Sequence, residues 1–457
     1  MSSLIKEKIK PNILPISLIL VVIIITFWGL GKAGLVDWDE AIYAQVSRNV
    51  FNGNPLVLHW GQGEILWFHK PPLYFWITGL FMNIFGVTEF SSRLLSALSG
   101  IGLSLVIYLF SRKMFDKNAG VFSLVLVLFN TFLLYSFRFG TLDVFALLLT
   151  TLSIYLFWIS QSNKKYIIAS FIILGLSGLV KGPVIAAPLL IIFLYVLFTG
   201  QLTAYLKSKY LWFGLIWMLL IFLPWHIYMY LKFNPDFYNQ YVLYHIVKRS
   251  KEAIEGHAGG LFFYPHILLR NFPYIILIPS LFFLGRKILK SKQKELLLLF
   301  IWLIIQYISI DRVATKLNWY ILPVFIPSTM ILAFTLSEIY KKKIAYKVII
   351  YLIIIFGTGF SLVKPYFAWK DLSGQEDDKA CFKKYTQIIQ SNYVTNGYEA
   401  PKAYFYLNTS NYNEIKNKNY TPQADETVLV DKKNGIVLSN SQDIIFENKT
   451  CKIIKIN

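Results

Sequence analysis

Long apolar runs separated by short polar segments fill residues 1–363 of the chain. A helix needs about 20 mostly apolar residues to cross the hydrocarbon core of a bilayer, and runs near that length recur throughout this part. They predict roughly eleven to thirteen membrane-spanning helices, centred on 13–31, 94–110, 119–137, 141–160, 166–180, 183–199, 210–231, 266–285, 295–310, 319–338 and 344–363. The shorter run 72–85 begins with proline, and we expect it to form a helix in the membrane interface.

The pattern changes in residues 364–457, where the apolar runs give way to sequence rich in Asn, Lys, Asp and Tyr. Short runs there predict a helix at 380–390 and strands at 402–407, 427–430, 436–438 and 452–456. We therefore expect a small, separate α/β domain. Its cysteines, Cys381 and Cys451, form a disulfide if the domain lies in an oxidising compartment, and are two buried thiols otherwise.

Composition supports a membrane protein and bears on its partners. The chain is 56% hydrophobic and only 15% charged, which is too little charge to cover the surface of a soluble protein of 457 residues. Its net charge of +20 is compatible with a nucleic-acid partner, but multi-pass proteins collect Lys and Arg in cytoplasmic loops, so we expect no nucleic acid. The first apolar run lacks a small-residue cleavage site, which favours a retained helix over a signal peptide.

Orientation follows from the same positive charges. With a cytoplasmic N-terminus, every loop on the cytoplasmic side is basic, as at 112–117, 164–165, 207–209, 286–294 and 341–347. The polar loop of residues 32–93 and the C-terminal domain then face outward. Most carboxylates before residue 364 face outward as well, so we look for chemistry on that side.

The outward loop 32–93 carries the first candidates. Asp39 and Glu40 stand before a short amphipathic stretch, where they either cap a helix or supply a general base whose pKa an apolar pocket raises. Lys70, in the sequence W-F-H-K-P-P, is held by two prolines. Its ammonium group either binds a lipid phosphate or extends to the headgroups as isolated lysines do.

Further polar residues lie at the outward ends of predicted helices. Lys181 in V-K-G-P and Lys316 in K-L-N-W-Y-I-L-P add cations beside constrained turns, and several such cations together favour an anionic ligand. Asp143 opens a predicted span, and we expect it to pair with Arg138 or Arg48 and to orient the site.

The histidines and the run 248–257 are less specific. The outward histidines have no compact metal-ligand spacing, which favours hydrogen-bonded structural roles over a metal site. The run 248–257 mixes basic and acidic residues and predicts an exposed loop over the site.

Several motifs of the outward loop resemble one family. D-E-A-I-Y-A-Q-V-S-R-N-V, G-N-P-L-V, H-K-P-P-L-Y-F-W and F-G-V-T-E-F-S-S-R-L-L-S are similar to the first outward loop of bacterial GT-C glycosyltransferases of the family 39 type. These are the aminoarabinose transferases and the protein mannosyltransferase-like enzymes. T-L-D, V-K-G-P and K-L-N-W-Y-I-L-P follow in the family's order, so the resemblance covers residues 30–335.

The resemblance implies a GT-C fold and an inverting transfer of a sugar from a polyprenyl-phosphate donor. It implies Asp39 as the catalytic base, with Glu40 as its catalytic neighbour. The other roles that it implies are donor-phosphate contacts at Lys70, Lys181, Lys316 and Tyr320, and supporting positions at Tyr43, Arg138 and Asp143.

A divalent metal, zinc or another ion, is a further implication. In the aminoarabinose branch an acid before the K-P-P lysine helps to bind such an ion, and His69 occupies that position here. His257 or His266 would be its companion. The branch also carries an arginine where this chain has Ile42, so the resemblance extends to the general activity and leaves the sugar open.

The implied partners are a polyprenyl-phosphate sugar, membrane lipids and an acceptor in the cell envelope. The acceptor stays open between lipid A, another glycan, a lipid and a protein hydroxyl. The implied location is the bacterial inner membrane, with the active site and the C-terminal domain in the periplasm. The alternative class is a transporter or flippase of a lipid-linked glycan, for which ionisable residues at the midplane are typical. Here they lie mainly at the outer rim, which favours the transferase.

Overall fold

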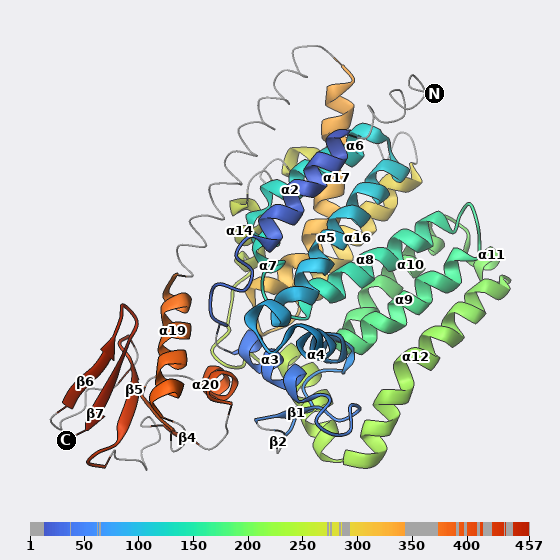
Figure 1. Ribbon diagram of the computed structural model, residues 1–457. Coiled ribbons are helices and arrows are strands. Elements are labelled where there is room, and N and C mark those ends of the chain that lie inside the picture. Colours follow the sequence, from blue (N-terminus) through green and yellow to red (C-terminus); the bar gives the residue numbers. More distant parts are fainter. Residues whose placement is uncertain are drawn as a thin grey trace, which may run out of the picture.

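The protein consists of a helical bundle and a small α/β domain beside one end of it (Figure 1). The computed structural model describes residues 13–342 except 37, 62, 64, 272–273, 275–276, 283–284 and 286–292, and further on 373–389, 393–396, 400–408, 412–414, 423–433, 435 and 442–456. The predicted boundary between residues 363 and 364 lies outside these ranges and stays a prediction.

The bundle is built from apolar helices that follow the predicted runs in order. They are α2 (Ile13–Phe27), α5 (Glu89–Met114), α6 (Lys117–Phe129), α7 (Thr131–Ser136), α8 (Asp143–Ile159), α9 (Tyr166–Lys181), α10 (Ala186–Phe198), α11 (Leu202–Leu206), α12 (Lys209–Phe233), α14 (Phe263–Arg270), α16 (Lys294–Asp311) and α17 (Leu322–Tyr340). Each predicted range up to 319–338 thus contains helix, whereas 344–363 lies outside the described residues.

These helices make the chain a multi-pass membrane protein. In the described part, four stretches are long and apolar enough to cross a bilayer: Glu89–Met114, Tyr166–Phe198, Lys209–Phe233 and Asn318–Tyr340. Large side chains such as Trp212, Leu220 and Leu231 are exposed along α12, which suits a lipid-facing surface.

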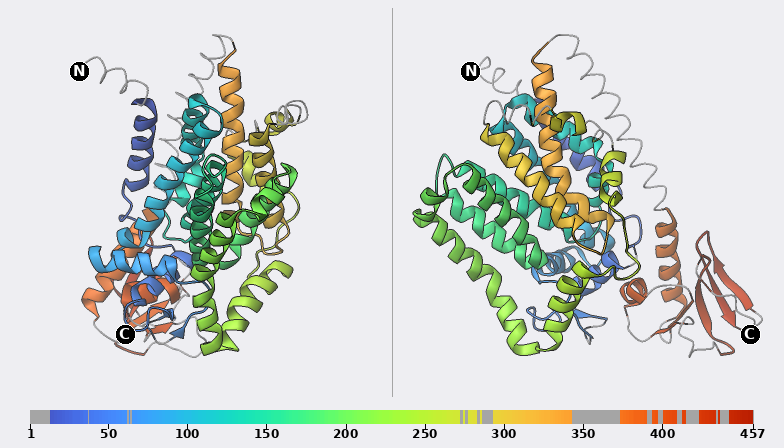
Figure 2. Two further views of the ribbon diagram at one scale, coloured as in Figure 1. Left: turned by 90° about the vertical axis from the view of Figure 1, so that its right-hand side faces the viewer. Right: turned by 180° about the vertical axis from the view of Figure 1, so that it is seen from behind.

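The outward loop folds at the end of the bundle that lies next to the α/β domain (Figure 1). It contains α3 (Asp39–Asn49), a short hairpin of β1 (His59–Trp60) and β2 (Ile65–Leu66), and α4 (Leu73–Phe85). Helix α4 is the helix predicted for 72–85, and it lies across the end of the bundle (Figure 2). Its Tyr74 and Phe75 are fully buried, so an apolar core fixes this loop.

The C-terminal domain is a five-stranded sheet with two helices in its described part. Its strands pair in the order β4 (Tyr412–Glu414), β3 (Tyr393–Asn396), β5 (Thr427–Asp431), β7 (Cys451–Ile456) and β6 (Gln442–Glu447). Strand β3 runs parallel to β4 and β5, and β7 runs antiparallel to β5 and β6. The predicted disulfide is confirmed, because Cys381 on α19 (Ser373–Ile388) is bonded to Cys451 on β7.

Two secondary-structure predictions for this domain need correction. Residues 402–407 are not a strand but part of α20 (Ala400–Leu407). Their run of aromatic residues is typical of a strand, yet Ala403 and Leu407, four residues apart, are both buried on one helical face. Strands β3, β4 and β6 were not predicted, and the predicted strand 436–438 lies outside the described residues.

Candidate active site

Asp39 begins α3 in the outward loop. It follows Trp38, whose φ of 66° lies in the left-handed region that residues other than glycine rarely adopt. Burial raises the pKa of the Asp39 carboxyl above its ordinary value, although the nearby cations Lys70, Arg249 and Lys181 oppose that shift. A carboxylate with a raised pKa among cations is a suitable general base beside an anionic substrate.

Lys70 is the cation that opposes this shift most. The buried residues Pro71 and Pro72 follow it and lead into α4, so its backbone is rigid. Burial, together with the positive charges of Lys181 and Arg249, lowers the pKa of the Lys70 ammonium to about 8. No carboxylate among the described residues lies within ion-pair distance of Lys70, which leaves its charge for an added anion.

Lys181 is the last residue of α9, where the left-handed backbone of Gly182 ends the helix. Its Nζ lies 2.5 Å from Oδ1 of Asp143 at the start of α8. The same Nζ lies 5.1 Å from the centre of the Tyr320 ring, within the range of a cation–π contact. Tyr320 belongs to η5 (Asn318–Ile321), so three distant segments meet here.

Arg249 is a member of this cluster that the sequence analysis did not assign. It begins α13 (Arg249–Lys251), and its Nη1 donates to the Tyr320 hydroxyl oxygen at 3.4 Å. Its Nη2 lies 3.0 Å from Oε2 of Glu255. Nothing in the run 248–257 distinguishes Arg249 from its basic neighbours, so only the fold could find it.

Tyr43 forms part of the apolar wall behind these charges. It is 5% exposed, and its ring contacts the rings of Trp67, Tyr74 and Phe75 at centroid distances of 5.6 to 6.1 Å. Burial raises the pKa of the Tyr43 hydroxyl, and the carboxylate of Asp39 adds to this shift. The phenol therefore stays neutral and supports the site by packing.

Glu40, the residue after Asp39, points into a different environment. Its two oxygens accept bonds from Nε and Nη2 of Arg93 at 2.8 and 2.9 Å. They also accept the backbone N–H groups of Val36 at 2.7 Å and Gly140 at 2.8 Å. Glu40 is only 2% exposed, so it is a fully bonded buried carboxylate and has no lone pair directed at the cation cluster.

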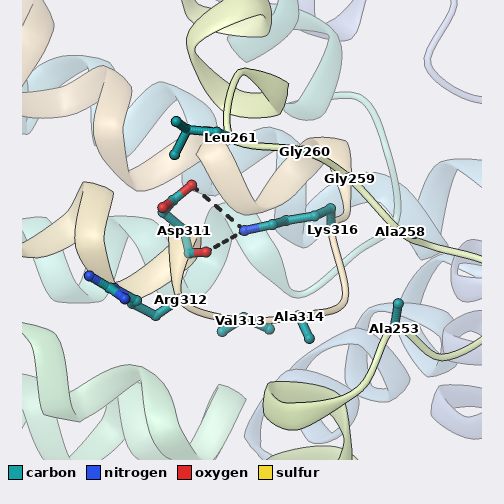
Figure 3. A pocket seen from close by; sticks show the side chains of 10 residues that line it. All are labelled: Ala253, Ala258, Gly259, Gly260, Leu261, Asp311, Arg312, Val313, Ala314 and Lys316. Carbon is teal, nitrogen blue, oxygen red and sulfur yellow. Dashed lines mark hydrogen bonds and ion pairs between the residues drawn. The ribbon is translucent and has the colours of Figure 1, made fainter.

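The side chains of Lys316, Arg138 and Arg48 bond to groups outside this cluster, although the N–H of Thr315, next to Lys316, donates to the Arg249 carbonyl at 3.2 Å. Lys316 bonds to the backbone and carboxylate oxygens of Asp311, and it lines a cavity of about 400 Å³ in which Arg312 points away from it (Figure 3). The expected pairing of Asp143 with Arg138 or Arg48 is wrong. Arg138 donates to the Ile25 carbonyl at 2.6 Å and Arg48 to the Phe405 carbonyl at 3.4 Å.

The histidines predicted as metal ligands are not brought together. In the described chain, no three His, Cys, Asp or Glu side chains form a group that could hold a metal. The ring that lies against His69 belongs to His245, with centroids 4.4 Å apart, and not to His257 or His266. Burial lowers the pKa of the His69 imidazole to about 4, and that of His245 as well, so both rings are neutral at pH 7.

Comparisons with known proteins support the fold and the resemblance that the sequence predicted. The family model described as dolichyl-phosphate-mannose-protein mannosyltransferase matches residues 69–228. The fold matches the crystal structure of ArnT from Cupriavidus metallidurans bound to undecaprenyl phosphate, with a TM-score of 0.74 over 96% of this chain and 97% of that chain, at 18% identity. The fold is therefore the one that the resemblance predicted, and the family model covers part of the same helical bundle.

Among individual relatives, the undecaprenyl phosphate-alpha-4-amino-4-deoxy-L-arabinose arabinosyl transferase 2 of Proteus mirabilis is 30% identical over 308 residues, which is 65% of this chain and 54% of its own length. The corresponding transferase of Aeromonas hydrophila is 26% identical over 357 residues, which is 75% of this chain and 64% of that protein's own length. The chain therefore spans between half and two thirds of the length of these relatives.

Proposed function

We propose that the protein transfers a sugar from a polyprenyl-phosphate donor to an O–H group of an envelope acceptor. The observation that carries this proposal is the position of Asp39, a partly buried carboxylate with a raised pKa, among the cations Lys70, Lys181 and Arg249. A base beside a group of cations is the arrangement that an acid–base displacement with an anionic leaving group requires. The names of the relatives, which are undecaprenyl-phosphate sugar transferases, support the choice of donor.

In this mechanism Asp39 takes the proton from the acceptor O–H while the oxygen attacks the anomeric carbon. The bond from that carbon to the phosphate oxygen breaks, and polyprenyl phosphate leaves from the opposite face, which inverts the anomeric centre. Lys70 and Arg249 contact the phosphate and offset the charge that develops on it. Tyr320 and Asp143 hold Arg249 and Lys181 in place.

Three predicted roles change in this proposal. Tyr320, which was expected to contact the phosphate, holds Arg249 in place. Glu40, whose oxygens are occupied by Arg93 and two backbone N–H groups, positions the segment that carries Asp39 and does not react. Lys316, which is bonded to Asp311, shapes the neighbouring loop and does not contact the phosphate.

A divalent metal fits the described residues only in part. Both ring nitrogens of His245 are buried and unbonded, and His69 lies against that ring, so two neutral imidazoles are present. Catalytic zinc is normally held by three protein ligands, and the described residues bring no third one to this pair. We therefore route no step of the reaction through a metal.

The proposed location is the bacterial inner membrane, with the N-terminus in the cytoplasm and Asp39 and the C-terminal domain in the periplasm. Helix α3, which Asp39 begins, and the C-terminal domain lie at the same end of the bundle (Figure 1). The Cys381–Cys451 disulfide supports an oxidising compartment for that end.

The test is sugar transfer by the full chain in native membranes with a labelled polyprenyl-phosphate donor. Asp39→Asn keeps the shape of the side chain but cannot accept the proton, so we expect kcat to fall by about 10²- to 10⁴-fold. Asp236→Asn is the matched control, because Asp236 is an exposed outward carboxylate outside the cluster. Equal transfer by Asp39→Asn and wild type, at equal expression, would refute the proposal.

A further inference from the structure

The first turn of α5 holds the segment that leads to Asp39. Glu89 and Arg93, four residues apart on this helix, are 4% and 5% exposed. The guanidinium of Arg93 donates to the carbonyls of Leu30 at 2.9 Å and of Ala33 and Gly34 at 2.8 Å, besides binding Glu40. One buried side chain thus fixes most of the backbone between α2 and α3.

The C-terminal domain supplies the remaining bonds to this segment. The hydroxyl of Tyr406 on α20 accepts the Leu35 N–H at 2.8 Å and donates to Oε1 of Glu89 at 2.9 Å. Lys379 on α19 donates to Oε2 of Glu89 at 2.7 Å and to the Gly31 carbonyl at 3.2 Å. Glu89 is therefore bonded on both oxygens by the domain.

Apolar contacts between α20 and α3 reinforce the polar bonds. Phe405, which is 6% exposed, packs in one cluster with Leu35, Ala41, Ala44 and Met82. Two of these residues, Ala41 and Ala44, belong to the helix that Asp39 begins. The domain therefore contacts both the segment before Asp39 and the helix after it.

The unfavourable backbone conformation of Trp38 depends on these contacts. A φ of 66° for a bulky residue is costly, and such a conformation persists only where the surrounding structure determines it. The Trp38 side chain is 62% exposed, so its own packing does not hold it. The bonds at Gly31, Leu35 and Val36 on one side and the packing of α3 on the other are what hold this turn.

We infer that Tyr406 and Lys379 are positioning residues for the catalytic base, so that the C-terminal domain is a working part of the active site. Through Glu89 and the 31–36 segment they fix the direction in which the Asp39 carboxylate points. This inference rests on the proposed function for its effect on the reaction, while its structural part stands without it. A displacement of the base by about 1 Å is enough to lower kcat while leaving donor binding unchanged.

The test combines kinetics with hydrogen exchange on the full chain in membranes or nanodiscs. Tyr406→Phe removes one hydroxyl and keeps the ring, so we expect about a tenfold lower kcat with the donor KM within about twofold of wild type. Amide exchange in residues 31–38 should become several times faster, because the Leu35 N–H loses its acceptor. Glu89 and Tyr406 belong to one contact, so their changes should not add. The loss of kcat in the double variant Glu89→Gln/Tyr406→Phe should be close to the larger of the two single losses and below their sum in free energy.

The matched control is Lys432→Ala, which breaks a lysine–carboxylate pair with Glu447 inside the same domain, with 2.6 Å between Nζ and Oε1. It should leave both readouts unchanged. If Tyr406→Phe lowers the melting temperature, Lys379→Met provides the test, because it removes only a half-exposed ammonium from the same contact.

Unchanged kcat in Tyr406→Phe and Lys379→Met overturns the inference, even if exchange rises, because the domain would then hold the loop without orienting the base. Unchanged exchange overturns it as well. If wild type itself transfers no sugar from the polyprenyl-phosphate donor, the proposed function fails. The exchange of residues 31–38 would still decide whether the domain fixes that segment.

Discussion

Asp39 and Glu40 are adjacent in the sequence but lie in two contrasting ionic environments. Glu40 is buried with four donors on its two oxygens, and Arg93 neutralises it. Asp39 lies among Lys70, Lys181 and Arg249, with its pKa raised by burial. The first environment is satisfied within the chain. In the second, Lys181 pairs with Asp143 and Arg249 with Glu255, whereas Lys70 has no carboxylate within ion-pair distance among the described residues.

The contrast separates stability from activity. A fully bonded buried pair contributes little net free energy when intact but is costly to break from one side. A buried cation such as Lys70, without an ion-pair partner among the described residues, is costly to assemble and marks a candidate functional site. Residues around Glu40 should therefore affect folding when changed, and residues around Asp39 should affect turnover.

The largest expected effect is that of Arg93→Met. It leaves the Glu40 carboxylate buried without its partner, and the free energy of unfolding should fall by about 3–5 kcal/mol. Thermal unfolding of the detergent-purified protein measures this loss, with Arg112→Met, an exposed arginine at the other end of α5, as the control. If Arg93→Met had the melting temperature of wild type, the ion pair around Glu40 would not be needed for stability, and the contrast with Asp39 would fail.

Arg249→Gln should come next and should act on the donor. Loss of the guanidinium should raise the donor KM about tenfold to a hundredfold, with little change in melting temperature, because one charge-assisted phosphate contact is lost. Initial rates at varied donor concentration give this value. Arg312→Gln is the control, since Arg312 is exposed and points away from Lys316 in the neighbouring cavity (Figure 3). An equal change in donor KM in the Arg249→Gln and Arg312→Gln variants would show that Arg249 does not bind the donor.

The pH dependence tests Asp39 and Lys70 separately. Asp39 acts as a base only when ionised, so kcat should fall about tenfold per pH unit once the pH drops below its raised pKa. Lys70 holds phosphate only when protonated, so the donor KM should rise as the pH passes about 8. A kcat that is level down to the ordinary pKa of an aspartate would contradict the buried position of Asp39.

The smallest effect is expected for Glu255→Gln. In the structure Glu255 occupies the guanidinium of Arg249, with Nη2 to Oε1 and Oε2 distances of 3.2 and 3.0 Å, and its backbone φ of 57° is unfavourable. Removing this competing carboxylate should lower the donor KM by about two- to fivefold, since the pair is half exposed. Glu252→Gln serves as the control, because Glu252 is an exposed acid on the same loop. A higher KM in Glu255→Gln would show that the pair helps the donor.

Much of this architecture was predictable because it depends on local patterns. The apolar runs determine the helices, and the motifs around Asp39, Lys70 and Lys181 mark residues that the fold brings together. Pairings between distant segments were not predictable. Asp143 pairs with Lys181 across two helices, and Arg249 reaches Tyr320 from a loop without a periodic pattern.

The contact between Lys316 and Asp311, five residues earlier, was not predicted from the sequence either. The phosphate contact implied for Lys316 stays a prediction. The strand predicted for 402–407 was wrong because a short run of apolar and aromatic residues fits both a strand and a buried helix.

The bond between Leu35 and Tyr406 also sets an order of events during biosynthesis, since its two residues are 371 positions apart. At about 5–20 residues per second the ribosome needs roughly 20–75 s to reach the second partner after making the first. Throughout that time Asp39 is already translated, but the domain that fixes its turn has not been made. On the proposed function, a nascent chain carries the Asp39 carboxylate in an unaligned form until the domain that contains Tyr406 has folded and docked.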